Sequence, residues 1–428
     1  MSVMGSQLGN LAPTGVSNSK GPIRMTTAAE TRSSRASEYS LGSVPPPSEP
    51  PRAAHLAFLD GVRGVACAYV ALHHCFLDLP PSSKTALFLR NLFSQGHCAV
   101  DVFIVLSGYC LMLPMLRTTD GVPFWSFIRR RALRILPTYY IAMAFSLLLI
   151  GTLLGKPTGS NWDASIPINA RDVVFHILLI HDWSKGSAFH INSPFWSIAV
   201  EWKIYFLFPA LVALRARRGA ATMAILAMIV GYLVWWFINH EGILNPSPWG
   251  SSPYYVGLFA LGMWAADLSV TDKQRKLATS PVRWGFALLS AITLSVVVVN
   301  YLRDWSWIPI QIVCGFVGLW AASGLALLRS GALPFAARVL SLAPLVYLGK
   351  MGYTVYLIHA PIAQFVAEYV IAPLPWSDTT RALLTGPIFA ALTLAISVVF
   401  YRLFELPFHE LSRRVWRDDR LPLSIRAR

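Results

Sequence analysis

Long apolar segments recur along most of this chain, and no other feature limits its possible folds as strongly. From residue 53 onward, stretches of about 20 apolar residues alternate with short polar connections. A helix of about 20 residues crosses the hydrocarbon core of a bilayer, because each residue advances it by about 1.5 Å. The predicted fold class is therefore all-α, a polytopic integral membrane bundle of about ten transmembrane helices. The expected spans are 56–78, 97–116, 135–154, 195–214, 220–240, 252–270, 282–301, 308–328, 344–371 and 381–405.

Composition favours a membrane protein over a nucleic-acid-binding protein, the class that the net charge alone would suggest. Hydrophobic residues make up 55% of the 428 residues and charged residues only 13%, against roughly 25% charged residues in soluble domains. The net charge of +15 would suit a nucleic-acid-binding protein, but the basic residues form short clusters between apolar runs. That pattern is typical of cytosolic membrane loops. We therefore expect the lipid bilayer as a partner and no nucleic acid.

The arginine and lysine clusters predict the orientation of the bundle. They lie at 129–134, 215–218, 273–276 and 413–420. All of them face one side if the short apolar stretch 172–183 does not cross the membrane. The positive-inside rule then predicts that both termini are cytosolic and that 155–194 is a long loop on the far side. The stretch 172–183 is expected to lie in the interface or dip into it, and the sequence leaves open which membrane this is.

Two polar ends flank the predicted transmembrane domain, which covers residues 53–412. Residues 1–52 are rich in Ser, Thr, Pro and Gly and contain no apolar run of signal-peptide length. Such a segment buries too little surface to fold, so we expect a disordered cytosolic tail. Residues 413–428 are expected to form a basic cytosolic tail. The five cysteines show no CxxC pair and no Cys/His spacing typical of a metal site, so we expect neither disulfides nor a metal.

The first span contains ionisable residues at a spacing that places two of them on one face. Ionisable groups within a membrane are costly and are therefore candidate functional residues. Arg63 and His74 are 11 residues apart, and at about 100° per residue this spacing returns to within about 20° of the same face. His73 lies about 100° away from that face. We therefore expect Arg63 and His74 to share a stripe that faces the bundle interior.

The predicted orientation sorts the candidate residues into two levels. His74, Asp101 and Glu201 lie toward the outer end of their spans, whereas Arg63 and the arginines at 129–134 lie toward the inner end. Arginines bind phosphate oxygens in a bidentate manner, and a neutral histidine can take the proton of an attacking hydroxyl. This division suits acyl transfer from acyl-CoA, whose nucleotide carries the phosphates.

Five segments, in order over about 300 residues, resemble motifs of the membrane-bound acyltransferase family 3. The first-helix signature of that family is an Arg and a His separated by ten residues, which Arg63 and His74 match. Ile104 and Tyr109 stand where the family has Phe. The similar segments are LDGVRGVACAYVALHH (59–74), AVDVFIVLSGYCL (99–111), FIRRRALRILPTYY (127–140), FWSIAVEWKIYFLFPAL (195–211) and LGKMGYTVYLIHAPI (348–362).

The resemblance implies a ten-helix membrane enzyme that moves an acyl group, often acetyl, from acyl-CoA to a hydroxyl. It implies that Arg63 and His74 are the essential pair, with His74 as the acid/base group. Acyl-CoA would be a co-substrate rather than a tightly bound cofactor, and no step requires a metal. We expect a small hydrophobic acceptor or secondary metabolite, with a cell-surface or lumenal carbohydrate as the alternative.

These arguments predict three groups of site residues, each with an alternative interpretation. The catalytic candidates are His74, Arg63 and Glu201; the acyl-CoA candidates are Arg63, Arg130, Arg131 and Arg134; the acceptor candidates are Asp101, His359 and Ser107. The arginines also fit ordinary topology, and Asp60 could simply balance Arg63. Ser107 could carry an acyl group or serve close helix packing. A transporter without chemistry is the alternative of a different class, although no internal repeat is evident.

Overall fold

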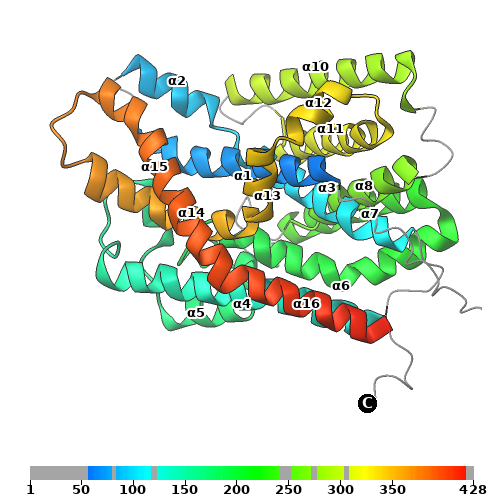
Figure 1. The fold of residues 1–428 in the computed structure, drawn as a ribbon, viewed down its shortest axis with the longest axis horizontal. Coiled ribbons are helices and arrows are strands. Elements are labelled where there is room, and N and C mark those ends of the chain that lie inside the picture. The colour runs from blue at the N-terminus through cyan, green and yellow to red at the C-terminus, as the bar shows by residue number, and fades with distance from the viewer. Residues whose placement is uncertain are drawn as a thin grey trace, which may run out of the picture. The chain divides into compact units, whose positions relative to one another are not determined.

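The computed structural model describes residues 56–79, 83–116, 123–184, 186–240, 252–270, 277–302 and 308–420. This part of the chain is helical, without β-strands, and forms one compact unit (Figure 1). The predicted tail 1–52 lies outside the described residues. The elements, with η marking short 3₁₀ or π segments, are α1 (Ala57–Phe76), α2 (Lys84–Leu92), α3 (Gly96–Met115), α4 (Phe124–Thr152), η1 (Asn161–Ser165), α5 (Ala170–Ile177), η2 (His181–Trp183), α6 (Phe195–Arg218), α7 (Ala220–His240), α8 (Tyr255–Val270), α10 (Ser280–Leu302), α11 (Ile310–Ser330), α12 (Pro334–Leu340), α13 (Ala343–Lys350), α14 (Gly352–Phe365), η3 (Val366–Ile371), α15 (Asp378–Phe400), η4 (Tyr401–Glu405) and α16 (Leu406–Arg420).

The predicted fold class is confirmed: the chain is an all-α, multi-pass membrane bundle. Within the described residues, eight helical runs are long and apolar enough to cross a membrane. Helices also occupy the two remaining predicted spans. One is α8, which is apolar but has only 16 residues; the other is α1, which carries the ionisable residues. The short α5 has only 8 residues, so the stretch 172–183 does not form a spanning helix.

The structure differs from the prediction mainly at helix ends and breaks. Helix α4 begins at Phe124 and so includes the arginine cluster that was expected to precede the span. The predicted span 344–371 is interrupted at Met351, where α13 ends and α14 begins. The last span continues through η4 into α16 up to Arg420, into the stretch expected to be a tail. Helices α2 and α12 lie in segments that apolar length did not single out.

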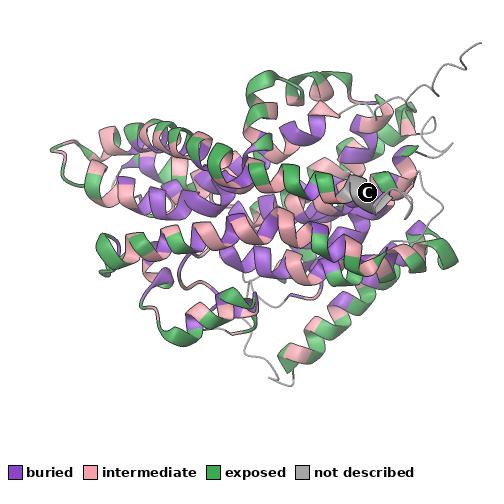
Figure 2. Cartoon of the chain, turned by 60° about the horizontal axis from the view of Figure 1, so that its bottom comes forward, coloured by how far each residue is buried: buried purple, intermediate pink, exposed green. Residues whose placement is uncertain are grey.

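Close helix packing in the bundle depends on glycine at the α3–α8 contact. A Cβ added to Gly108 would lie 2.0 Å from the carbonyl oxygen of Phe259, and one added to Gly262 would lie 1.9 Å from that of Val105. Neither position can hold a larger side chain without moving a backbone. Small residues at such contacts let two helix backbones approach in the membrane, where the hydrophobic effect does not drive association. Figure 2 shows that buried residues gather on the faces that the helices turn toward one another.

Candidate active site

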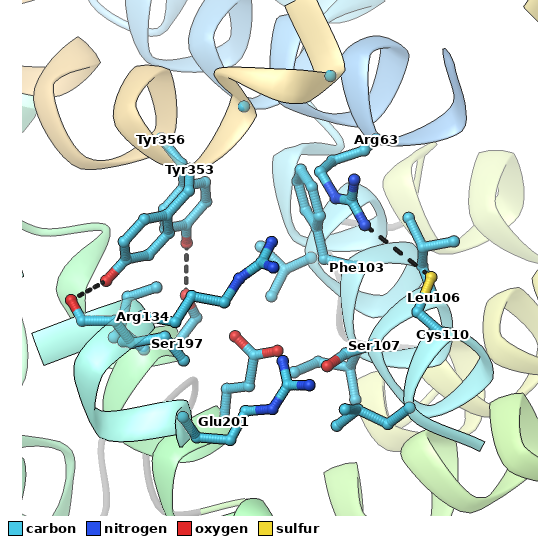
Figure 3. A pocket seen from close by; sticks show the side chains of 18 of the residues that line it. Arg63, Phe103, Leu106, Ser107, Cys110, Arg134, Ser197, Glu201, Tyr353 and Tyr356 are labelled. Carbon is cyan, nitrogen blue, oxygen red and sulfur yellow. Dashed lines mark hydrogen bonds between the residues drawn. The ribbon is translucent and has the colours of Figure 1, made fainter. Parts of the chain in front are cut away.

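A pocket of about 290 Å³ lies between α1, α3, α4, α6, the α13–α14 break and η4. Its wall is unusually polar for the interior of a membrane bundle. Figure 3 shows Arg63, Arg134, Glu201 and Ser107 around one space. The ionisable and hydroxyl-bearing residues in the wall are Arg63, Ser107, Arg131, Arg134, Ser197, Glu201, Tyr205, Lys350, Tyr353, Tyr356 and Glu405.

Three of the four arginines predicted to bind acyl-CoA line this pocket. Arg63 donates from Nη1 to Asp60 at 2.6 Å and points Nη2 toward the Cys110 sulfur at 3.9 Å. Arg131 lies over the Tyr205 ring, with its guanidinium carbon 5.8 Å from the ring centroid. Arg134 also lines the pocket. The predicted donor arginines therefore converge from α1 and α4, which are distant in sequence.

The fourth arginine, Arg130, does not line the pocket. Its side chain is buried, and Nε donates to the Ser126 carbonyl one turn earlier in the same helix at 3.1 Å. The three consecutive arginines at 129–131 point in different directions around α4, because successive helical residues are about 100° apart. A basic run alone did not indicate which of them faces inward.

Glu201 is in the pocket, but not beside His74 as its predicted level implied. Its carboxylate accepts a hydrogen bond from Tyr205 Oη at 2.5 Å and lies near the Arg131 charge. The predicted grouping of Glu201 with His74, opposite the arginines, is therefore wrong. Depth along a span does not determine lateral contacts, and the packing of α6 against α4 brings this carboxylate to the arginines.

Ser107 lies in the pocket wall, with its hydroxyl 3.4 Å from that of Tyr205. The close helix packing expected of the Ser-Gly pair belongs to its neighbour, Gly108. Ser107 therefore faces the pocket, and the Tyr205 hydroxyl links its hydroxyl to Glu201.

His74 does not line the pocket; a row of aromatic rings joins it to the pocket wall. The Phe103 and Tyr356 ring centroids are 5.9 Å apart, those of Tyr356 and His359 are 5.7 Å apart, and those of His359 and His74 are 5.1 Å apart. Arg63 likewise meets α14, because its side chain packs beside Gly352. The predicted common stripe of Arg63 and His74 thus faces α14.

His359 has a defined tautomer and a buried nitrogen without a partner. Its Nδ1 donates to the Tyr356 carbonyl at 2.8 Å, since a carbonyl can only accept. Nε2 therefore carries the lone pair, and this buried atom has no hydrogen-bond partner. A basic nitrogen next to His74 is thus held in place by the backbone of α14.

Asp101 belongs to neither the pocket wall nor the histidine pair. Its side chain is fully buried near the Cys314 thiol and the Tyr255 ring. The predicted level shared by Asp101, His74 and Glu201 therefore does not form one site. In the described residues, no group of three or more His, Cys, Asp or Glu side chains is arranged to hold a metal ion.

Glu405 is a buried carboxylate at the pocket that no sequence motif indicated. Glu405 accepts hydrogen bonds from the backbone nitrogen of Thr354 at 3.1 Å and from its hydroxyl at 2.6 Å. It thereby caps the first turn of α14, where a negative charge is favoured by the helix dipole. The cost of a carboxylate at the end of the predicted span 381–405 was the signal that could have found it.

The fold and the pocket define a multi-pass membrane protein with a charged interior site. The sequence profile described as "Acyltransferase domain" matches residues 56–402, and the chain therefore belongs to this acyltransferase family. The family resemblance drawn from the five motifs is thus confirmed, and the protein is an acyltransferase by family.

Relatives of known name agree with this class. Acyltransferase MdmB of Streptomyces mycarofaciens is 28% identical over 37% of this chain and 40% of its own length. A putative O-acetyltransferase of Staphylococcus aureus (strain MRSA252) is 23% identical over 86% of this chain and 60% of its own length. O-acetyltransferase OatA of S. aureus (strain NCTC 8325 / PS 47) is 24% identical over 74% and 52%. The matches thus span less than two thirds of these relatives. No solved structure matches the chain.

Proposed function

We propose that this protein is a membrane O-acyltransferase that moves an acyl group, most simply acetyl, from acyl-CoA to the hydroxyl of a small hydrophobic acceptor such as a secondary metabolite. The observation that carries the proposal is a single pocket that Arg63, Arg131 and Arg134 line and that a row of rings connects to His74. The names of the S. aureus relatives support an acetyl group and an oxygen acceptor.

The arginines are the proposed donor site. Guanidinium groups match phosphate oxygens in geometry and keep their charge in a low-dielectric site. The buried Arg131 Nε has no hydrogen-bond partner, so it is available to an anion. The nucleotide of acyl-CoA would bind here, and its pantetheine arm would extend along the pocket toward Tyr356. This arrangement needs the arginine end of the pocket to face the cytosol, as the positive-inside rule predicts for the side that holds both termini.

His74 is the proposed acid/base group. Its neutral imidazole takes the proton of the acceptor hydroxyl while the oxygen attacks the thioester carbonyl carbon. The C–S bond of the resulting tetrahedral intermediate then breaks, and the imidazolium returns the proton to the CoA sulfur. The products are an ester and CoA. His359 would position the His74 ring by packing against it, with the ring centroids 5.1 Å apart. Glu201 would support the arginine end rather than the histidine.

The donor site is tested with labelled acetyl-CoA and a pool of lipid and metabolite acceptors. Purified wild-type protein is expected to move label into an extractable ester. Arg131→Gln is expected to raise the KM for acetyl-CoA about tenfold or more, since a hydrogen bond to a charged group contributes about 1.5–3 kcal/mol. Arg283→Gln, an exposed position on α10, is the control and should behave as wild type.

The outcomes separate the candidate functions. Mass spectrometry of the labelled ester identifies the acceptor, and a labelled carbohydrate would replace the hydrophobic acceptor in the proposal. If labelled acetyl-CoA is neither cleaved nor used with any acceptor, and longer acyl-CoAs give the same result, the enzyme proposal fails and the transporter alternative gains support.

A further inference from the structure

Helix α16 lies beyond the last predicted span and contacts Arg134, which lines the pocket. The run α15–η4–α16 is continuous from Asp378, and α16 packs along α4 (Figure 1). Two hydrogen bonds fix this contact. The Ser412 hydroxyl donates to the Arg130 carbonyl at 3.0 Å, and Arg134 Nη1 lies 2.9 Å from His409 Nε2. Helix α16 is thus anchored to α4, the helix that carries Arg131 and Arg134.

The bond between Arg134 and His409 has only one possible direction. A guanidinium can only donate, so His409 Nε2 accepts and the imidazole is neutral in this arrangement. The bond fixes the Arg134 guanidinium, which lines the pocket. The charged groups that face His409 are all arginines, namely Arg134, Arg413, Arg131 and Arg63.

Among the side chains that the structure describes, up to residue 415, this arginine group forms one direct ion pair, between Arg63 and Asp60. The nearby carboxylates are already engaged: Asp60 binds Arg63, Glu201 accepts from Tyr205 and Glu405 caps α14. None of Arg131, Arg134 and Arg413 lies within 4.0 Å of a carboxylate among the described residues. The four guanidinium groups therefore outnumber the three carboxylates near them, Asp60, Glu201 and Glu405. The uncompensated like charge is repulsive, so a bound anion would stabilise the group.

We propose that α16 forms the outer part of the nucleotide site, in which His409 positions Arg134 and Arg413 binds the ribose 3′-phosphate of acyl-CoA. This inference rests on the proposed function. Arg413 is exposed and stands one turn beyond His409 on the same face, outside the pocket wall. When the thioester lies deep in the pocket, the nucleotide is the part that remains at the rim. Arg131 and Arg134, inside the rim, are then left for the diphosphate.

The neighbouring residue Arg414 offers a matched control. Both side chains are exposed, but Arg414 lies about 100° around the helix from Arg413 and so leaves the face that carries His409. A role for general positive charge on α16 would be shared by both arginines. A specific phosphate contact would belong to Arg413 alone.

The experiment compares acetyl-CoA with acetyl-3′-dephospho-CoA as donors. Arg413→Gln is expected to raise the KM for acetyl-CoA about tenfold, leave kcat nearly unchanged and leave the KM for the dephospho donor unchanged. Arg414→Gln should match wild type with both donors. Equal effects of the two substitutions, or an equal effect of Arg413→Gln on both donors, would overturn the assignment of the 3′-phosphate.

A membrane role for α16 gives a different result. If α16 binds anionic lipid headgroups instead, both substitutions should weaken activity in nanodiscs with anionic lipid and have no effect in neutral ones, which contradicts the inference. Wild-type protein that uses neither donor contradicts the proposed function. In that case calorimetric titration still tests the site: equal affinity of wild type and Arg413→Gln for CoA would refute it.

His409 is a positioning residue, and its test uses a conservative variant. His409→Leu removes the acceptor for Arg134, so it is expected to raise the KM of both donors about tenfold, because both contain the diphosphate. His409→Gln retains an acceptor oxygen and should restore most of this loss. If the two variants behave alike on both donors, His409 does not act through Arg134.

Discussion

Helices α10 and α14 differ in how apolar they are and in how much of each is buried. In a soluble protein the more apolar helix would be the more buried one, whereas here it is the less buried one. The α10 window is strongly apolar, yet only 11% of its residues are buried within the protein. The run that begins with α14 is less apolar, and 67% of its window is buried. In a bilayer, apolar side chains are satisfied by lipid, whereas polar side chains need protein partners or a cavity. The more polar helix therefore occupies the middle of the bundle.

The candidate site lies on the buried helix of this pair. Helix α14 carries Tyr356 in the pocket wall and His359 beside His74. Helix α10 has only Thr293 and Asn300 buried and presents residues such as Leu294 outward. Substitutions in the two regions should therefore differ in both kind and size.

The largest expected difference is between an inner and a peripheral histidine. His74→Ala is expected to lower kcat by about 10²–10⁴-fold, the usual contribution of a positioned acid/base group. His240→Ala, an exposed position at the end of α7, should retain wild-type activity. The measurement is acetyl transfer by purified variants of equal thermal stability. Equal activity of His74→Ala and wild type would remove His74 from the mechanism.

Leucine truncation on the two helices tests the burial difference directly. Leu357 on α14 is fully buried, whereas Leu294 on α10 is 64% exposed. Leu357→Ala is expected to cost about 2–5 kcal/mol of unfolding free energy because it leaves a cavity. Leu294→Ala should change it by less than about 0.5 kcal/mol. Unfolding in one detergent gives both values, and similar costs would refute the assigned burial.

Lowering the pH should destabilise the long loop within residues 155–194 at a higher pH than it destabilises the transmembrane helices. His176 and His181 stack there with ring centroids 3.8 Å apart, and burial lowers the pKa of His176 to about 4. Burial also holds the pKa of His181 well below its usual range. The unfolded loop therefore binds protons that the folded loop does not, and its stability should fall as pH drops from about 6.5 toward 4. For His176 alone the loss is about 3 kcal/mol.

Hydrogen exchange at pH 7 and pH 5 measures this effect. The comparison uses protection factors, which correct for the slower chemical exchange of amides at pH 5. Protection in residues 170–184 and 186–194 should fall from pH 7 to pH 5, while protection in α14 should change little. The charged and titratable groups around the pair are Asp172, His190 and Lys203. The control is His181→Phe, which keeps a stacked ring and should reduce the pH dependence. Loop protection that does not change with pH in the wild type would contradict the prediction.

Glycine substitution gives the smallest effect. Gly262→Ala on α8 is expected to cost about 1–3 kcal/mol, because the new Cβ meets the Val105 carbonyl oxygen. An added Cβ at Gly285 on α10 has no neighbour within 4 Å, so Gly285→Ala should be neutral or stabilise by up to about 1 kcal/mol. Thermal unfolding of the two variants measures both changes in stability. An unchanged unfolding temperature in Gly262→Ala would mean that α3 and α8 can separate slightly to accommodate the new Cβ.

Local periodicity made much of this architecture predictable. Apolar length alone located ten segments that the structure finds to be helical, one of them interrupted at Met351. The 11-residue spacing placed Arg63 and His74 on one stripe, which the structure finds facing α14. Apolar length could not locate α16, because a polar, amphipathic helix has the composition of a tail. It could not locate the break at Met351 either, because an interrupted span is as apolar as a continuous span. The arginine run at 129–131 likewise indicated a basic cluster without showing that Arg131, and not Arg130, faces the pocket.

The sequence by itself determined the membrane bundle, the family and the set of ionisable residues whose burial in a membrane is energetically costly. Only the tertiary structure decided which of those residues meet. It brought Glu201 to Arg131, placed Asp101 in a separate buried cluster and set His359 against His74. The physical reason is that a residue's depth and face follow from its position along one helix, whereas its partners depend on how separate helices cross and pack.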